Sequence, residues 1–239
     1  MSIKILNLII IFILLPNFIS AWDWNTHKSI VEELYYSIPY ELQSQLSLEL
    51  LKKGSIAPDK IFHDNRLHHF PPSYNKTLYW LNTTNHYISI GDYNNASYSF
   101  GIATHYISDS FVAPHSVSGE DYKLHSKFEK SPIPIKTKCQ KQNYNLCKGL
   151  EKAELNGNDW EIWLKNQTKK IPQKELDQAM QLIFPLFLKT FNTTCEERTT
   201  IFKEEKFQIG NKTKNYLIFI IIFFMGNIKI KYFSKLIDH

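Results

Sequence analysis

The sequence predicts an all-α fold, arranged as a single multi-helix domain. Apolar residues recur at helical spacing along most of the chain, signals for strands are few, and no glycine-rich phosphate loop is present. The body between the two apolar ends is roughly 190 residues long, which suits one domain. Hydrophobic residues make up 43% of the chain and aromatic residues 14%, which is enough for a core. The net charge of +5 is mild and does not by itself indicate nucleic-acid binding.

The N-terminal residues 1–21 are typical of a secretory signal peptide. Lys4 gives a basic start, an apolar run spans Ile5 to Leu15, and Ala21 is a small residue at the expected cleavage site. An uncleaved membrane anchor is the alternative, but the run is shorter than the ~20 residues that a helical span needs. Cleavage after Ala21 would make Trp22 the first residue of an exported protein.

Two further features bear on export. Six Asn-x-Ser/Thr sequences occur, although a chain rich in Asn and Thr also forms them by chance. Their asparagines are Asn75, Asn82, Asn95, Asn166, Asn192 and Asn211. The three cysteines, Cys139, Cys147 and Cys195, allow three pairings, each with one disulfide and one spare thiol, and we expect the spare thiol to be buried. Pairing of Cys139 with Cys147 would close a short loop, and pairing of Cys147 with Cys195 would join two late segments.

The first predicted helices follow the N-terminal segment directly. One begins at Thr26, an N-cap candidate, and runs to Pro39, and a second continues with the same period to Gly54. Their apolar faces consist of Ile30, Leu34, Ile38, Leu42, Leu46 and Leu50. Each face can be buried against other helices of the domain.

The remaining helices have similar signals. They are expected over residues 76–90, 92–108, 120–130, 150–165 and 173–204. Asp92 is placed to cap the second of these, and a loop containing Pro and Lys is expected over 131–145. Pro185 should kink or split the last helix, because proline lacks the amide hydrogen that an interior helical residue donates.

The C-terminal segment 213–239 forms a hydrophobic and basic tail, so the predicted domain covers residues 22–212. The run from Tyr216 to Ile228 is almost entirely apolar, and Lys229 and Lys231 follow it. A membrane anchor with its basic end inside would have this pattern. The run is nevertheless short for a bilayer, so a buried terminal strand or helix is the alternative.

Two pairs of residues at helical spacing suggest a metal centre. His105 and Asp109 lie four residues apart, as do His125 and Glu129, so each pair shares one face of its helix. Pro114 should end the first helix and allow His115 to turn back toward the same point. Either pair alone would most often be a surface contact, but two pairs with a histidine between them favour a metal site.

Upstream residues could complete such a site. Asp59 follows Pro58 and would otherwise be an N-cap. Of the adjacent His68 and His69, at most one should reach the same centre, since neighbouring side chains point in different directions. We expect His69, with His68 as the alternative. Three other histidines, His63, His86 and His239, are interpreted as ordinary surface, core or tail residues.

The order of these residues resembles that of the zinc-dependent phospholipase C family, which shares its fold with the S1/P1-type nucleases. The resemblance covers about residues 22–129 and rests on the series Trp–His–Asp–His–His-x-x-x-Asp–His–His-x-x-x-Glu. It implies three zinc ions. The implied ligands are Trp22, through its amino group and carbonyl, with His27, Asp59, His69, His105, Asp109, His115, His125 and Glu129.

The resemblance also implies roles for two carboxylates. Asp109 would bridge the zinc at Trp22 and His27 to the zinc held by Asp59, His69 and His105, and Asp59 is the candidate general base. Together Asp59 and Asp109 are the expected catalytic residues. The intervals from Asp59 to His69 and from His115 to His125 are shorter than in the bacterial phospholipases, which affects the expected substrate pocket more than the metals.

These observations favour an exported, zinc-dependent hydrolase that cleaves a phospholipid phosphodiester and lies outside the cell or at its surface, near a membrane. Glu129 supports this function, because the nucleases usually have Asp there. The five-residue step from Trp22 to His27 is closer to the nucleases, and only under that alternative would nucleic acid be the substrate. A non-catalytic, zinc-stabilised surface protein is disfavoured, since structural zinc sites are rich in Cys. Four aromatic residues, Phe62, Phe70, Tyr74 and Tyr79, could line an apolar pocket or belong to the core.

Overall fold

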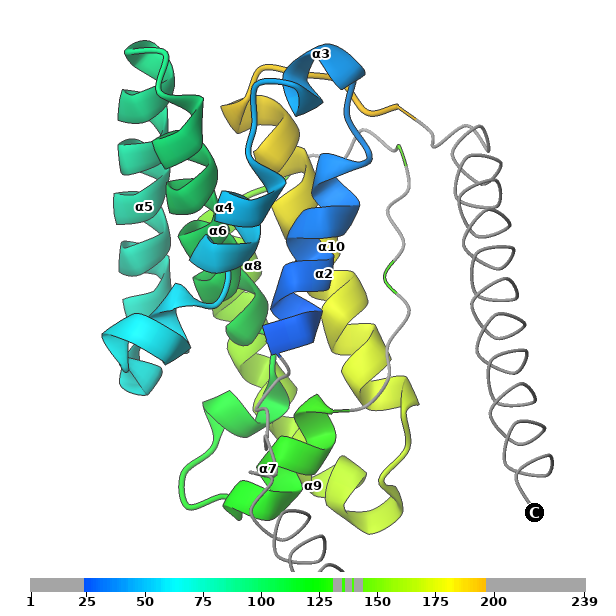
Figure 1. Cartoon of the computed structure of the whole chain (residues 1–239). Helices are drawn as coiled ribbons and strands as arrows, with labels where there is room; N and C mark the ends of the chain where they lie inside the picture. Colours follow the sequence, from blue (N-terminus) through cyan, green and yellow to red (C-terminus); the bar gives the residue numbers. More distant parts are fainter. Residues whose placement is uncertain (1–23, 131–134, 136–138, 140–143, 197–239) are drawn as a thin grey trace, which may run out of the picture. The chain divides into compact units, whose positions relative to one another are not determined.

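The structure, a computed structural model, describes residues 24–130, 135, 139 and 144–196 (Figure 1). All of these lie in one compact unit, Met1–Glu197. The expected signal peptide, the candidate ligand Trp22 and the tail at 213–239 fall outside the described residues. Among the residues that are described, no helix is long and apolar enough to cross a membrane.

The described part of the chain is helical and contains no strand, as the sequence predicts. The α-helices are α2 (Trp24–Tyr35), α3 (Tyr40–Gln43), α4 (Leu48–Gly54), α5 (Pro72–Ser89), α6 (Tyr93–Asp109), α7 (Tyr122–Glu129), α8 (Leu146–Ala153), α9 (Gly157–Asn166) and α10 (Lys170–Thr190). The short turns are η1 (Pro58–Phe62), η2 (Asn65–Leu67), η3 (Ala113–Ser116) and η4 (Glu154–Asn156).

Helix α6 is the centre of the fold. Almost every residue from Ala96 to Asp109 is buried, which is the pattern of a helix surrounded by others. Helices α2, α4, α5 and α10 pack against it. Its start is well defined, because the Asp92 side chain accepts a hydrogen bond from the Asn95 amide at 3.0 Å, confirming the predicted cap. The site residues at its C-terminal end therefore have a rigid support.

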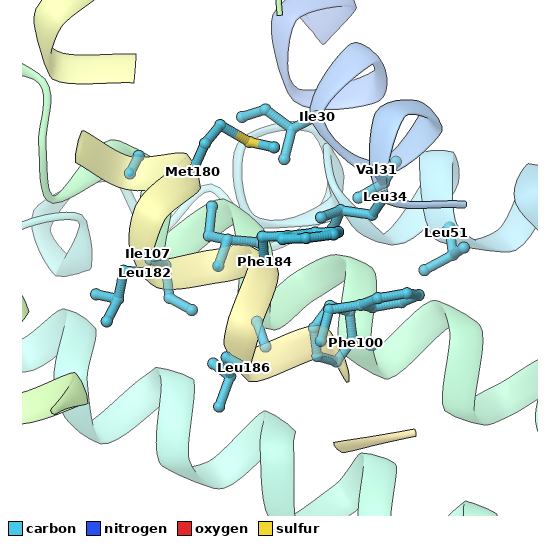
Figure 2. Close-up of a cluster of buried hydrophobic side chains, with 14 of the residues drawn as sticks. Ile30, Val31, Leu34, Leu51, Phe100, Ile107, Met180, Leu182, Phe184 and Leu186 are labelled. Carbon is cyan, nitrogen blue, oxygen red and sulfur yellow. The ribbon is translucent and has the colours of Figure 1, made fainter. Parts of the chain in front are cut away.

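The core is formed mainly by α2, α6 and α10. Side chains from these helices meet in one cluster, including Ile30, Leu34, Phe100, Met180 and Phe184 (Figure 2). Each large aliphatic or aromatic side chain fully buried in this way contributes about 1.5–3 kcal/mol. This cluster fixes α2 and α6 beside one another, which brings their polar residues together at one end.

Helices α4 and α6 approach each other through two glycines. A Cβ atom on Gly54 would collide with the Tyr98 carbonyl, and one on Gly101 would collide with the Leu51 carbonyl. Only glycine permits this backbone contact. The contact brings the Ser55 carbonyl within 2.8 Å of His105 Nδ1, one turn beyond Gly101 on α6.

Some predicted helix boundaries are wrong. The second predicted helix is two pieces, α3 and α4, because Ser47 caps a new helix by accepting from the Leu50 amide. The last helix ends at Thr190 as far as the structure describes it, and it runs through Pro185 without splitting. Pro185 has no amide hydrogen to donate to the Gln181 carbonyl, one turn earlier in the helix. Gln181 is exposed, so water can donate to that carbonyl instead.

The cysteines form one disulfide and leave one thiol, as expected, and the structure selects one of the three possible pairings. Cys139 is bonded to Cys195, and Cys147 is free. The bond links the segment after α7 to the segment after α10. The expectation of a buried spare thiol is wrong, since Cys147 is only half-buried.

Candidate metal centre

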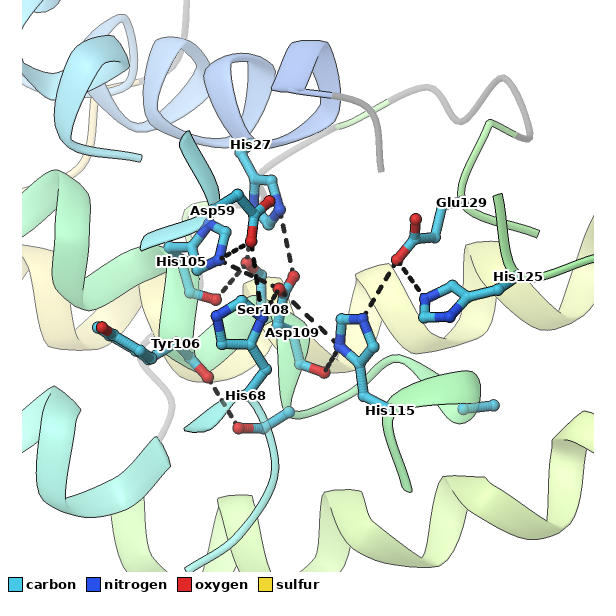
Figure 3. Close-up of polar contacts among 12 residues, drawn as sticks. His27, Asp59, His68, His105, Tyr106, Ser108, Asp109, His115, His125 and Glu129 are labelled. Carbon is cyan, nitrogen blue, oxygen red and sulfur yellow. Dashed lines mark hydrogen bonds and ion pairs between the residues drawn. The ribbon is translucent and has the colours of Figure 1, made fainter. Parts of the chain in front are cut away.

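Four residues from three parts of the chain form a first group of possible metal ligands. Asp59 comes from η1, His68 follows η2, and His105 and Asp109 lie one turn apart on α6 (Figure 3). His105 Nε2 is 3.3 Å from Asp59 Oδ1 and 3.2 Å from Asp109 Oδ2. The predicted pair on α6 and the predicted Asp59 are thus brought together.

Of the two adjacent histidines, His68 belongs to this group and His69 does not, which corrects our expectation. His68 Nδ1 lies 2.9 Å from Asp109 Oδ2 and 3.7 Å from Asp59 Oδ1. His68 is buried, whereas His69 is only half-buried, and its Nδ1 contacts the neighbouring Phe70 carbonyl at 3.0 Å. Two adjacent side chains diverge, so only one of them can reach the group.

Asp64 explains why His68 is the residue that turns inward. Asp64 Oδ2 accepts a 2.6 Å hydrogen bond from the Tyr106 hydroxyl on α6, and Asp64 Oδ1 lies 3.5 Å from His68 Nε2. Asp64 and Tyr106 were missed by the sequence interpretation. The spacing of Asp64 and His68, four residues apart, was the available signal.

His115, His125 and Glu129 form a second group beside the first. Glu129 Oε1 is 3.2 Å from His115 Nε2 and 2.7 Å from His125 Nε2. His115 comes from η3 and the other two from one face of α7, as the i, i+4 spacing predicts. The rings of His68 and His115 have centroids 5.7 Å apart, so the two groups are neighbours.

Asp109 lies between His27 and the other members of the first group. Its Oδ1 lies 3.2 Å from His27 Nε2, while its Oδ2 faces His68 and His105. His115 Nδ1 is also 3.8 Å from Oδ2. A carboxylate whose two oxygens face different imidazoles has the geometry that a bridging ligand requires.

Contacts outside the groups orient the histidine rings. The Nδ1 atoms of His27, His105 and His115 contact the Ser108 hydroxyl, the Ser55 carbonyl and the Asp109 carbonyl, at 3.1, 2.8 and 3.1 Å. In each ring this contact leaves Nε2 directed at a carboxylate of the groups. Metal-binding histidines are characteristically held in this way, with the second nitrogen hydrogen-bonded to a carbonyl or carboxylate.

The charges of the first group favour ionised carboxylates. Burial alone would raise the pKa of Asp59, but the His105 imidazole holds it below its ordinary value, and the pKa of Asp109 lies well below its own. Burial opposes a charge on His105 and His68, yet the facing carboxylates raise both pKa values. The same electrostatics would attract a divalent cation in place of protons.

The second group behaves in the same way. Although burial would raise the pKa of Glu129, hydrogen bonds from His115 and His125 lower it to about 2. Burial would lower the pKa of His125, but Glu129 and Glu120 raise it. A buried carboxylate that is ionised at neutral pH therefore faces two imidazole nitrogens, which is a donor set suited to zinc.

The donor atoms fit a metal ion. His105 Nε2 and Asp109 Oδ1 are buried and make no hydrogen bond, which is costly for polar atoms in a protein interior. Among the described residues, the candidate ligand atoms are imidazole nitrogens and carboxylate oxygens, the mixture that zinc accepts. The geometry therefore fits zinc, and Trp22, the remaining expected ligand, lies outside the described residues.

The C-terminal half braces the turn that carries His115. Glu175 on α10 accepts a hydrogen bond from the Ala113 amide at 3.1 Å, and Asn156 donates to the Phe111 carbonyl at 2.8 Å. Burial raises the pKa of Glu175 well above its ordinary value. Neither residue was singled out from the sequence, since nothing local marks a contact across more than forty residues.

A comparison with protein families agrees with this geometry. The family described as zinc dependent phospholipase C matches residues 26–190, which include every described candidate ligand. The chain belongs to this family, and its all-α fold and zinc-dependent hydrolase chemistry follow from that membership. No curated protein and no solved structure matches the chain.

Proposed function

We propose that the protein is an exported phospholipase C that uses three zinc ions to hydrolyse a phospholipid phosphodiester. The observation that carries this proposal is the position of the Asp109 carboxylate. Its two oxygens face His27 on one side and His68 and His105 on the other. Family membership supports the reaction class. The substrate, the number of ions and the site of action are the parts that we add.

The proposed ligands divide into three sets. One zinc would be held by the amino end of Trp22 together with His27 and Asp109. The second would be held by Asp59, His68, His105 and Asp109, with His68 replacing the expected His69. The third would be held by His115, His125 and Glu129. The contacts of 2.7–3.7 Å among the described members support the second and third sets.

Zinc held in these positions would supply Lewis acidity to the phosphoryl oxygens and would lower the pKa of a bound water molecule to ~7. Asp59 is the residue best placed to accept a proton from the attacking water. Its side chain is 22% exposed, whereas that of Asp109 is 2% exposed. Asp109 is therefore assigned to holding the ligands together.

The reaction breaks one bond and forms one. Water oxygen attacks phosphorus, the bond between phosphorus and the glycerol oxygen breaks, and the glycerol oxygen takes a proton as diacylglycerol leaves. The imidazoles of the three sets must be neutral to hold the ions, so acid should inhibit the protein. The predicted signal peptide would place this reaction outside the cell or at its surface, with the tail as a proposed anchor.

The test is to measure hydrolysis by the processed, zinc-loaded protein of phosphatidylcholine and of single-stranded DNA. We expect release of diacylglycerol and phosphocholine and no cleavage of DNA. Cleavage of DNA without release of phosphocholine would overturn the proposal in favour of the nuclease alternative. A zinc-loaded protein that hydrolyses neither substrate would contradict both.

A further inference from the structure

Exposed apolar side chains begin on the same turn that carries Asp59. Ile61 is 58% exposed and Phe62 is 38% exposed, only two and three residues beyond Asp59. On the neighbouring helix α5, Tyr79 is 62% exposed. Scattered apolar side chains are ordinary on a protein surface, but a group of them beside a catalytic residue points to a binding role.

These side chains belong to one continuous surface. The rings of Phe62 and Trp80 are stacked, with centroids 5.8 Å apart and an interplanar angle of 4°. Trp80 contacts Tyr79 edge to face at 5.2 Å. Trp80 also packs against the buried cluster of Ala57, Ile102 and Tyr106. The core thus supports this surface, which we call the aromatic face and define as Ile61, Phe62, Tyr79 and Trp80.

A hollow adjoins the aromatic face at Tyr79. It measures about 390 Å³ and is lined by Leu67, Pro72, Asn75, Lys76 and Tyr79. Lys76 Nζ lies 3.6 Å from Asp64 Oδ2, and Asp64 is the residue that contacts His68. A molecule on the aromatic face would therefore be close to the proposed zinc ligands.

Positive charge flanks the same surface. Lys76 lines the hollow, and Lys60 lies between Asp59 and Ile61, with its ammonium group 5.1 Å from the Trp24 ring. Basic side chains bordering exposed aromatic and aliphatic ones are typical of proteins that bind at the surface of an anionic bilayer. The charge of the rim is complementary to anionic headgroups.

The chemistry of the face favours lipid over single-stranded nucleic acid. Nucleic-acid bases bind by stacking on free aromatic rings. Trp80 is stacked by Phe62 and packed against the core, and Ile61, one of the two most exposed members, has no ring. Ile61 and Tyr79 can instead enter the region between headgroups and acyl chains, where apolar and amphipathic side chains are both favoured.

We propose that the aromatic face docks on an anionic phospholipid surface and so presents the lipid phosphodiester to Asp59 and the zinc centre. This inference rests on the proposed function and names the physical form of its substrate, a lipid assembly. Ile61 and Tyr79 would insert, while Lys60 and Lys76 would contact headgroup phosphates.

The test compares Ile61→Glu with the matched control Ile162→Glu in the full chain. Ile162 on α9 is 50% exposed and belongs to neither ligand group. Hydrolysis is measured on vesicles of phosphatidylcholine with phosphatidylserine and on short-chain phosphatidylcholine below its micelle concentration. Because both variants retain the tail, any binding by the tail is common to both.

We expect Ile61→Glu to reduce vesicle hydrolysis about tenfold more than hydrolysis of the monomeric lipid, and Ile162→Glu to change the ratio little. Tyr79→Ser should act in the same direction, and zinc content reports whether each variant is folded. Equal losses on both substrates for Ile61→Glu and Tyr79→Ser would overturn the docking face.

Vesicle sedimentation separates this inference from the proposed function. If the wild-type protein hydrolyses no phospholipid but binds anionic vesicles through Ile61 and Tyr79, the proposed function fails and the docking face stands. If the protein hydrolyses monomeric lipid, and Ile61→Glu and Tyr79→Ser still bind and hydrolyse vesicles like the wild type, only the docking face fails. A larger loss of single-stranded DNA binding than of vesicle binding in Ile61→Glu would also overturn it.

Discussion

The two groups of candidate ligands differ in how the fold holds them. In the first group His105 is fully buried, Asp109 and His68 are 2% exposed, and the central helix α6 supplies two of the four residues. Asp59 is the exposed member of this group, at 22% of its side chain. In the second group the side chains of His115 and His125 are 14% and 15% exposed, and they come from the turn η3 and the short helix α7. The first group is therefore expected to bind its ion more tightly.

Their supports differ as well. The Ser55 carbonyl that orients His105 is held by the glycine contact between α4 and α6. The turn carrying His115 depends on Glu175 and Asn156, which belong to the C-terminal half. A change in that half should affect the second group while the first remains intact.

Substitution of Asp109 by Asn should have the largest effect, because Asp109 joins the first group to His27. We expect the variant to lose two of three zinc ions and to lose activity by about a thousandfold or more. Metal analysis of the purified protein and phospholipid hydrolysis measure the two quantities. Full zinc content with an undiminished rate would contradict the bridging assignment.

His68→Ala and His69→Ala form a matched pair within the first group. Since only His68 faces Asp59 and Asp109, His68→Ala should lose one zinc and reduce activity at least about a hundredfold. His69→Ala should retain its zinc and most of its activity. Zinc content per chain is measured for both variants. Loss of zinc from His69→Ala but not from His68→Ala would show that His69 is the ligand.

His125→Ala tests the second group by itself. It should lose only the zinc held with His115 and Glu129 and leave the first group loaded. In the wild-type protein, a chelator should remove this zinc first, because His115 and His125 are more exposed than the histidines of the first group. Time-resolved chelation followed by a colorimetric dye measures both effects, and simultaneous release of all ions would show that the groups are not independent.

Glu175→Gln should have the smallest effect, on the pH dependence of stability. Burial raises the pKa of Glu175 in the folded state above the ordinary value of 4.5, so the folded state retains a proton that the unfolded state has lost. The contribution to stability is fully present below pH 4.5 and declines as pH rises toward the folded-state pKa, by at most about 1.4 kcal/mol per pH unit.

Glutamine carries no such proton but can still accept from the Ala113 amide. The free energy of unfolding of Glu175→Gln, relative to wild type, should therefore rise between pH 4.5 and neutral pH. Denaturant titrations of both proteins at pH 5 and pH 7 measure this difference. Parallel pH profiles would show that Glu175 is ionised in the folded protein.

The sequence predicted those parts of the site that local geometry determines. The pairs His105–Asp109 and His125–Glu129 follow from helical spacing alone, and the structure confirms that each shares a face. The choice between His68 and His69 depends on Asp64 and Tyr106, and Tyr106 is far away in the sequence. Apart from the four-residue spacing between Asp64 and His68, the sequence near these two adjacent histidines does not indicate which one turns inward.

Long-range contacts explain the other differences. The pairing of Cys139 with Cys195 depends on how the segments after α7 and α10 meet, which spacing does not reveal. Of the four aromatic residues considered for a pocket, Phe70 and Tyr74 pack against the main core, whereas Phe62 and Tyr79 are exposed. Tyr74 and Tyr79 both lie on α5, and the packing of that helix decides which of them reaches the core.

Anomalous diffraction at the zinc absorption edge, from crystals of the processed protein, tests the central claim most directly. We predict one peak among Asp59, His68, His105 and Asp109, a second among His115, His125 and Glu129, and a third between His27, Asp109 and the amino end. Absence of a peak at the carboxylate of Asp109 would contradict this prediction.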